Sequence, residues 1–448
     1  MPTPTALQDS EPHKNADAAI PISLETDSSA VPNGLPLSNE AGGQEETKPE
    51  EQTETVPDGG AVAVGTVVAS LISHVVLFGV VYSYGVYNAH YQDIGVGSPF
   101  QVALIGSCST VFIPGLGVLS GKAAAHFGFR QMILVGSIIL STGLFLASFT
   151  TNLILLILTQ GVVFGVGCSL VYFPVLSLPS QWFLKRRALA VGIAVSGTGI
   201  GGLIFSVSTD RMLNTVGLEW TLRATSITAL VLLLAINPLC KTRIPASTSK
   251  IDFSVVKDTR FILLLFSCMF SNFAMFVSVD FLPIYARERG NLTLHDGANL
   301  VAIYNICSTC GRILMGLASD SFLGPTNSLV VSMWITAVAN FAWLACTDFP
   351  SLACFSAFNG LFGGAVWGLL PVVIAGMFGS TGKLVSLIAC LYSVLAIGNF
   401  FSPITTSTVE EAYGLEWMAI YAGVIATMAA LFGTASRLVH DSKVFVKV

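Results

Sequence analysis

Arg312 is the one firmly charged side chain near the centre of a long apolar stretch, residues 299–319. Asn305, Ser308 and Thr309 precede it by seven, four and three residues, so a helix would place all four on one face. A guanidinium offers a planar fork of N–H donors that matches a carboxylate. The pattern therefore predicts an anion-binding stripe made of these four residues. The alternative is a structural arginine neutralised by helix carbonyls or by a neighbouring side chain.

Other polar or amphipathic side chains lie at a similar depth in apolar stretches. Trp367 and Tyr392 would suit the wall of a ligand cavity. Asp280 and His74 are candidate proton-coupling groups, because a carboxylate and an imidazole both exchange protons. Simpler roles compete, namely a vestibule or capping carboxylate for the first and a neutral imidazole bonded to a backbone carbonyl for the second. Further candidates for the cavity wall are Tyr82, Tyr84, Asn272 and Asn399.

These side chains need elements that cross a bilayer, and the composition is that of a membrane protein. Hydrophobic residues make up 53% of the 448 and charged residues 10%, well below the roughly 25% charge of soluble domains. Twelve mostly apolar stretches are each long enough to cross the roughly 30 Å hydrocarbon core. We therefore expect an all-α membrane protein with twelve transmembrane helices in two six-helix halves. The expected spans are 61–88, 100–120, 131–149, 153–178, 188–209, 221–239, 261–285, 299–319, 328–346, 351–377, 384–406 and 417–436.

The charge pattern divides the chain further. Residues 1–57 hold eleven acidic and two basic residues, which predicts a disordered acidic cytosolic tail. The break at 241–260 is rich in basic residues and lacks apolar periodicity, so we expect a cytosolic linker there. It separates an N-terminal six-helix half, 58–240, from a C-terminal six-helix half, 261–439. Residues 440–448 are expected to form a second cytosolic tail.

Most lysines and arginines fall on the side of the membrane that carries the two termini, and the positive-inside rule assigns that side to the cytosol. The sequon at Asn291 falls on the other side and is the candidate glycosylation acceptor. The expected location is therefore a membrane crossed many times by the chain. We expect the plasma membrane, with the vacuolar or another internal membrane as the alternative.

Two loops at equivalent positions, after the second and the eighth span, carry related residues. These are Gly121, Gly128 and Arg130 in the first loop, and Gly316 and Asp320 in the second. They resemble two copies of the G-x-x-x-D-R-x-G-R-R motif of the major facilitator superfamily. The resemblance implies parallel repeats and the major facilitator fold. The first copy has Ala125 in place of the acidic residue, so a charge relay through that loop is not expected.

A second resemblance lies at the start of the fifth span. Residues 182–197 resemble the YFxKRRxLAxGxAxAG signature of monocarboxylate porters, with a tryptophan in place of the tyrosine, and residues 58–60 keep part of another porter signature. In that family an arginine in the eighth helix is associated with binding the substrate carboxylate, which implies the same role for Arg312. The basic residues and glycines of these motifs are expected to anchor, pack and gate the helices. They are Asp58, Lys185, Arg186, Arg187, Gly192, Gly197 and Asp320.

Several function classes lack support in the sequence. The six histidines are scattered without ligand spacing, so we expect neither an enzyme nor a metal centre nor a cofactor. No P-loop motif is present, which leaves a gradient as the energy source. We predict a gradient-driven secondary transporter that moves a small organic anion or monocarboxylate-like solute by alternating access. Efflux of a fungal secondary metabolite is the alternative, and a transporter-fold nutrient sensor is the third candidate. The expected partners are a small-molecule substrate, protons and the lipid bilayer, with no nucleic acid and no identifiable protein partner.

Overall fold

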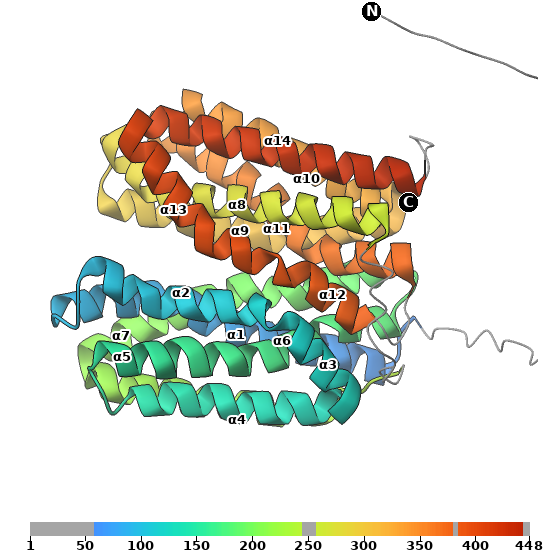
Figure 1. The fold of residues 1–448 in the computed structure, drawn as a ribbon, viewed down its shortest axis with the longest axis horizontal. Coiled ribbons are helices and arrows are strands. Elements are labelled where there is room, and N and C mark those ends of the chain that lie inside the picture. Colours follow the sequence, from blue (N-terminus) through green and yellow to red (C-terminus); the bar gives the residue numbers. More distant parts are fainter. Residues whose placement is uncertain (1–57, 244–256, 380–383, 442–448) are drawn as a thin grey trace, which may run out of the picture. The chain divides into compact units, whose positions relative to one another are not determined.

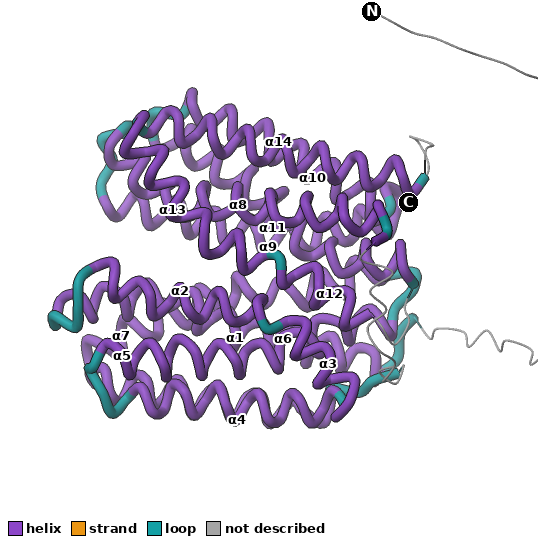
Figure 2. The backbone as a smooth tube through the Cα atoms, viewed as in Figure 1, coloured by secondary structure: helices purple, strands orange, loops and turns teal. Residues whose placement is uncertain are grey.

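The structure, a computed structural model of the 448-residue chain, describes residues 58–243, 257–379 and 384–441. The predicted acidic tail, 1–57, lies outside the described residues, as do most of the linker, 241–260, and most of the tail at 440–448. Helices and short connections make up the described part, which contains no strand (Figure 2). This result agrees with the expected all-α class.

The helices form two groups, one from each half of the sequence (Figure 1). The first group consists of α1 (Ala61–Asp93), α2 (Pro99–Gly115), α3 (Gly117–Phe127), α4 (Phe129–Ala147), α5 (Leu153–Leu156), the π-helical turn η1 (Ile157–Val163), α6 (Phe164–Trp182), α7 (Arg187–Ile236) and η2 (Asn237–Leu239). The second group consists of α8 (Thr259–Glu288), α9 (Leu294–Ala318), η4 (Ser319–Leu323), α10 (Pro325–Ala342), η5 (Trp343–Ala345), α11 (Phe349–Phe378), α12 (Leu384–Ser393), α13 (Leu395–Tyr413) and α14 (Leu415–His440).

The described helices account for the twelve expected spans. Ten are long and apolar enough to cross a membrane, and the pair α2 and α3, bent by 52°, makes an eleventh. One of the ten, α7 with its extension, has 53 residues and would be roughly 80 Å long at 1.5 Å per residue, more than twice a bilayer core. Gly217 breaks it with φ 80° and ψ 174°, a conformation that suits glycine, so α7 contains two spans.

The broken helices were not expected from the sequence. The second span is interrupted between α2 and α3, next to Pro114, whose ring removes one N–H donor from the helix. The eleventh span is interrupted between α12 and α13 at Val394. The two breaks face each other, because a Cβ on Gly115 would lie 3.5 Å from Ala396 Cβ and one on Gly117 would lie 2.8 Å from the carbonyl oxygen of Ala389. Both halves therefore bend at the place where they meet.

Glycines bring the two groups together along α7 and α9. A Cβ on Gly192 of α7 would collide with the carbonyl oxygen of Arg312, and one on Gly316 of α9 would lie 2.6 Å from the carbonyl oxygen of Ala188. The two backbones thus cross without a side chain between them. Gly197 plays a similar part within the first group, where its added Cβ would collide with the backbone of α1 at Leu71. These contacts hold α7 against both α1 and α9.

Candidate functional site

A cavity with a volume of about 360 Å³ lies between the two groups of helices and receives side chains from both. We call the end of the bundle at which α1, α7 and α8 begin the linker end. The cavity lies on the side of Arg312 away from that end, because its lining uses the second part of α1 and the first part of α9. The polar and aromatic lining residues are Phe78, Tyr82, Tyr84, Thr110, Tyr172, Thr198, Asn272, Phe276, Tyr304, Asn305, Arg312, Trp367, Tyr392 and Asn399.

Arg312 lines this cavity and is 5% exposed. Its Nε donates to the carbonyl oxygen of Gly364 (3.4 Å) and its Nη1 to that of Val195 (3.2 Å), so it contacts both halves. The carbonyl contacts expected for a structural arginine are therefore present, but they are long and use two of five N–H donors. Within the described ranges, no carboxylate forms an ion pair with this guanidinium. A buried cation without a counter-ion favours an anion from solution.

The four residues of the predicted anion-binding stripe separate into two pairs. Asn305 and Arg312 both line the cavity, whereas Ser308 and Thr309 do not. Ser308 packs against the backbone of α11 at Gly364, and Thr309 packs against α7 at Gly199. At 100° per residue, Asn305 lies about 20° from Arg312 around the helix, but Ser308 lies about 40° to one side and Thr309 about 60° to the other. Helix packing on both flanks leaves a narrower stripe than the sequence suggested.

Trp367 and Tyr392 both line the cavity, as predicted for its wall. The Tyr392 hydroxyl donates to the carbonyl oxygen of Trp367 (3.3 Å), and the two rings lie 6.5 Å apart. Tyr392 also meets Tyr172 of the first group edge-on, with ring centroids 5.9 Å apart. Aromatic side chains thus bridge the two halves at the floor of the cavity.

Polar residues on the other wall join the halves as well. The amide of Asn272 in α8 donates to Asn399 Oδ1 (2.6 Å), and the amide of Asn399 in α13 donates to the carbonyl oxygen of Thr110 in α2 (2.6 Å). Tyr82 and Tyr84 also line the cavity, so all four further wall candidates lie there.

Sequence reasoning missed Tyr172 and Tyr304. Tyr304 stands eight residues before Arg312, about 80° around the helix on the same side as Ser308 and farther from Arg312, so the spacing gave no signal for it. No signal pointed to Tyr172 either, because its place in the cavity depends on how α6 packs.

His74 lies beneath the cavity and does not line it. Its Nδ1 lies 2.7 Å from the carbonyl oxygen of Ser70, and a carbonyl can only accept, so Nδ1 carries the proton. Nε2 is buried and has no hydrogen-bond partner among the residues that the structure describes. The ring stacks on Phe78 (6.1 Å) and meets Tyr172 edge-on (5.6 Å), and both of these side chains line the cavity. Asp280, the second candidate for proton coupling, belongs to α8, but its side chain lies outside the described part of the structure.

At the linker end, two carboxylates hold the segment that leads into α7. Asp58 Oδ1 accepts hydrogen bonds from the backbone N–H groups of Leu184 (2.6 Å) and Lys185 (2.7 Å). Asp320, which belongs to η4 of the second group, accepts one from Ala188 (3.0 Å) and one from Leu189 (2.7 Å). The carboxylate of Asp320 therefore caps the amino-terminal end of a helix from the other half, where the helix dipole favours negative charge.

The three basic residues at this end, Lys185, Arg186 and Arg187, differ in how deeply they are buried. Lys185 and Arg186 are exposed, whereas Arg187 is 8% exposed and its Nε donates to the carbonyl oxygen of Phe183 (3.1 Å). Asp58 contacts this segment through the backbone amides of Leu184 and Lys185. Asn291, the candidate glycosylation acceptor, is exposed in the turn between α8 and α9 at the opposite end of the bundle. No group of histidine, cysteine, aspartate or glutamate side chains in the described ranges could hold a metal ion.

Comparisons with known proteins agree with this architecture. Curated relatives include the "Aspyridones efflux protein apdF" of Emericella nidulans, 27% identical over 87% of this chain and 81% of that protein. They also include the "Fujikurins efflux protein" of Gibberella fujikuroi (27% identical; 87% and 86% covered) and the "Agnestins efflux protein AgnL12" of Paecilomyces divaricatus (29% identical; 88% and 91% covered).

Solved structures share the fold. The major facilitator transporter FucP in the outward conformation aligns with a TM-score of 0.67 over 82% of this chain and 98% of that one, at 14% identity. The human organic anion transporter MFSD10 aligns with a TM-score of 0.63 over 83% and 98%, at 12% identity. The family model of the Major Facilitator Superfamily matches residues 62–297. These matches, together with the two helical groups around one cavity, show that the chain is a multi-pass membrane protein of the major facilitator superfamily.

Proposed function

We propose that the protein exports an organic anion with an apolar, ring-bearing body by alternating access, driven by a gradient. The observation that carries this proposal is Arg312, a buried cation that lines the cavity and has no acidic partner in the described ranges. The direction is supported by the three relatives whose names describe efflux of aspyridones, fujikurins and agnestins. Among the functions expected from the sequence, the efflux alternative is therefore the better supported one.

The cavity wall favours a cargo larger than a simple monocarboxylate. Eight aromatic side chains line the cavity, namely Phe78, Tyr82, Tyr84, Tyr172, Phe276, Tyr304, Trp367 and Tyr392. A ligand of a few atoms would leave most of this aromatic surface without a partner, whereas rings stack on it favourably. The monocarboxylate-porter resemblance covers residues 182–197, of which Val195 alone lines the cavity, so it carries little information about the cargo.

The structure corresponds to an outward-facing state if the linker end faces the cytosol, as the distribution of basic residues indicates. The cavity lies on the outer side of Arg312, and the inner side is closed by the α7–α9 contact at Gly192 and by Asp320 on the first turn of α7. To load cargo from the cytosol, Asp320 must leave these amides while the outer walls approach each other. We place the protein in the plasma membrane, with Asn291 on the outer face.

His74 is the proposed proton-coupling group. Because Nδ1 already donates to Ser70, a proton would bind at the buried Nε2. The resulting imidazolium would be repelled by the positively charged guanidinium of Arg312. Tyr172, whose ring meets the imidazole edge-on, is the other titratable side chain beside it. An anion on Arg312 would remove that repulsion, so proton and anion would travel together.

The proposal is tested by untargeted comparison of metabolites inside cells and in their medium, with the intact gene, without it, and with Arg312→Gln. We expect an anionic, ring-bearing compound to accumulate in the medium only with the wild-type chain, and to remain inside cells that carry the variant. Identical distributions in all three strains, or accumulation of the compound inside wild-type cells, would contradict export.

A further inference from the structure

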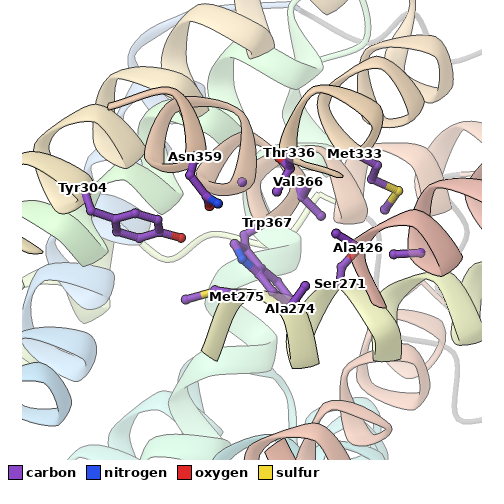
Figure 3. A pocket seen from close by; sticks show the side chains of 12 residues that line it. Ser271, Ala274, Met275, Tyr304, Met333, Thr336, Asn359, Val366, Trp367 and Ala426 are labelled. Atoms are coloured by element: carbon purple, nitrogen blue, oxygen red, sulfur yellow. The ribbon is translucent and has the colours of Figure 1, made fainter. Parts of the chain in front are cut away.

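A side pocket opens behind the wall of the central cavity, within the second group of helices (Figure 3). Its volume is about 20 Å³, enough for one water-sized group. Met275, Tyr304 and Trp367 line both this pocket and the central cavity, so these three side chains form the boundary between the two. In Figure 3, Tyr304, Asn359 and Trp367 point toward one another around the pocket. A group carried on a cargo in the cavity needs only to pass this boundary to enter it.

The hydrogen-bond network behind the pocket determines which kind of group fits. The side-chain amide of Asn340 donates to the carbonyl oxygen of Thr336 (2.9 Å), which can only accept, so Asn340 Oδ1 faces the other way. That oxygen accepts from the Ser278 hydroxyl (2.7 Å) and from Asn359 Nδ2 (3.0 Å). Asn359 must therefore present its NH₂ group to the network and its Oδ1 elsewhere.

The free oxygen of Asn359 faces the pocket. Asn359 is 1% exposed, and its Oδ1 has no hydrogen-bond partner in the part of the chain that the structure describes. A Cβ on Gly363, which lines the pocket, would lie 3.4 Å from this oxygen. The Thr336 hydroxyl, also in the lining, already donates to the carbonyl oxygen of Ser332 (2.8 Å), so it can offer the pocket only an acceptor. Two polar groups of the lining, Asn359 Oδ1 and the Thr336 hydroxyl, thus act as acceptors and can receive a hydrogen bond from a donor on a ligand.

We propose that the side pocket is a specificity subsite that binds one O–H or N–H donor of the cargo through Asn359 Oδ1. This subsite rests on the proposed function, because it needs an anionic cargo held at Arg312. Arg312 Nε contacts Gly364 of α11, and Asn359 lies five residues earlier on the same helix, a rise of about 7.5 Å toward the outer end. The cargo then carries its donor on the outer side of its anionic group, on a rigid body between the two.

Two flat anions that differ by one hydroxyl test the subsite. In 6-hydroxy-2-naphthoate the hydroxyl and the carboxylate stand at opposite ends of a rigid ring pair, and 2-naphthoate lacks the hydroxyl. Binding of each to the purified full-length chain is measured by isothermal titration calorimetry. We expect the hydroxy compound to bind about tenfold more tightly, because only it gives the buried oxygen a donor.

Two substitutions remove the subsite in different ways. Asn359→Leu deletes the acceptor, and Gly363→Ala places a methyl group against it while its distances to Asn359 Oδ1 (3.4 Å) and the Tyr304 hydroxyl (3.6 Å) remain ordinary contacts. The second variant keeps the Asn340–Asn359 hydrogen bond and so keeps the fold. Each should reduce the hydroxyl preference to about one while 2-naphthoate binding stays within about twofold of wild type. Asn214→Leu, at an exposed asparagine in α7, is the matched control and should keep the preference.

The outcomes separate the subsite from the function on which it rests. If wild type binds both compounds equally, or if the preference survives both substitutions, the subsite is wrong and the anion site at Arg312 stands. If 2-naphthoate does not bind, or binds Arg312→Gln as well as wild type, the anion site is wrong and the subsite falls with it.

Discussion

The linker end and the central cavity belong to one interface between the two halves, yet they treat charge in opposite ways. At the linker end, Asp58 and Asp320 each accept two backbone N–H groups. In the cavity, Arg312 makes two long contacts with carbonyl oxygens and meets no carboxylate in the described ranges. At the linker end the carboxylates have their hydrogen bonds satisfied, and that of Asp320 joins the two halves. In the cavity, the charge of Arg312 lacks a charged partner in the described ranges and is available to a ligand.

The largest effect is expected when the charge of Arg312 is removed. In Arg312→Gln we expect the export rate to fall by about a hundredfold or more, because loss of a buried, charged hydrogen-bonding partner costs about 2–5 kcal/mol. The measurement is flux of 2-naphthoate out of cells that express equal amounts of each variant at the membrane. Arg211→Gln, at an exposed arginine of α7, is the control and should transport normally. Near-normal flux in Arg312→Gln would show that the charge is structural.

The second prediction concerns the packed side of the interface. In Gly192→Ala the added methyl group collides with the carbonyl oxygen of Arg312, and overpacking of this kind costs about 1–3 kcal/mol. We expect export to fall about tenfold and the thermal unfolding midpoint of the purified chain to drop. Gly65→Ala is the matched control, because its methyl group would lie 3.6 Å from Leu239 Cδ2 and fits. Equal midpoints for the two variants would mean that α7 and α9 do not need close contact.

The third prediction compares the two carboxylates. Asp320 joins the halves, whereas Asp58 and the amides that it binds both belong to the first half. Loss of a helix cap costs about 1 kcal/mol, so Asp320→Asn should raise the population open at the linker end about fivefold, and Asp58→Asn should raise it less. The measurement is the alkylation rate from the cytosolic side of Thr198→Cys, a cavity-lining position, in a chain without other cysteines. Equal rates in the two variants would remove the special role of Asp320.

The smallest effect is expected at His74. Because its Nε2 has no partner, His74→Gln should lower export by less than about threefold at equal pH on both sides. If proton and anion leave together, acidifying the medium should slow export by wild type but not by the variant. His126→Gln, at an exposed histidine next to the α3–α4 turn, is the control and should keep the wild-type response. Export by wild type that ignores an imposed pH gradient would exclude this coupling.

The sequence predicted features that depend on hydropathy and on single buried charges. The twelve spans and the place of Arg312 follow from the fact that lipid tolerates few polar groups, so each such group is informative. The roles of Ser308 and Thr309 depended instead on which flank of α9 packs against α7 and α11, and a single sequence does not contain that neighbourhood.

Contacts between residues far apart in the chain could not be predicted from the sequence either. The motif at Asp320 was visible, but its contact with the amides of α7 joins residues more than 130 positions apart. The side pocket at Asn359 had no sequence signal at all, because it depends on the orientation of an amide within a three-helix network.

The central claim is that Arg312 is a buried cation that binds an anion. The most direct test is the equilibrium binding, at neutral pH, of two compounds of similar shape that differ in charge. 2-Naphthoate and 2-naphthamide have nearly the same shape, and only the first carries a charge. We predict that wild type binds the naphthoate at least about tenfold more tightly, and that Arg312→Gln abolishes the difference. Equal affinity of wild type for the two compounds, or a difference that persists in Arg312→Gln, would contradict the account.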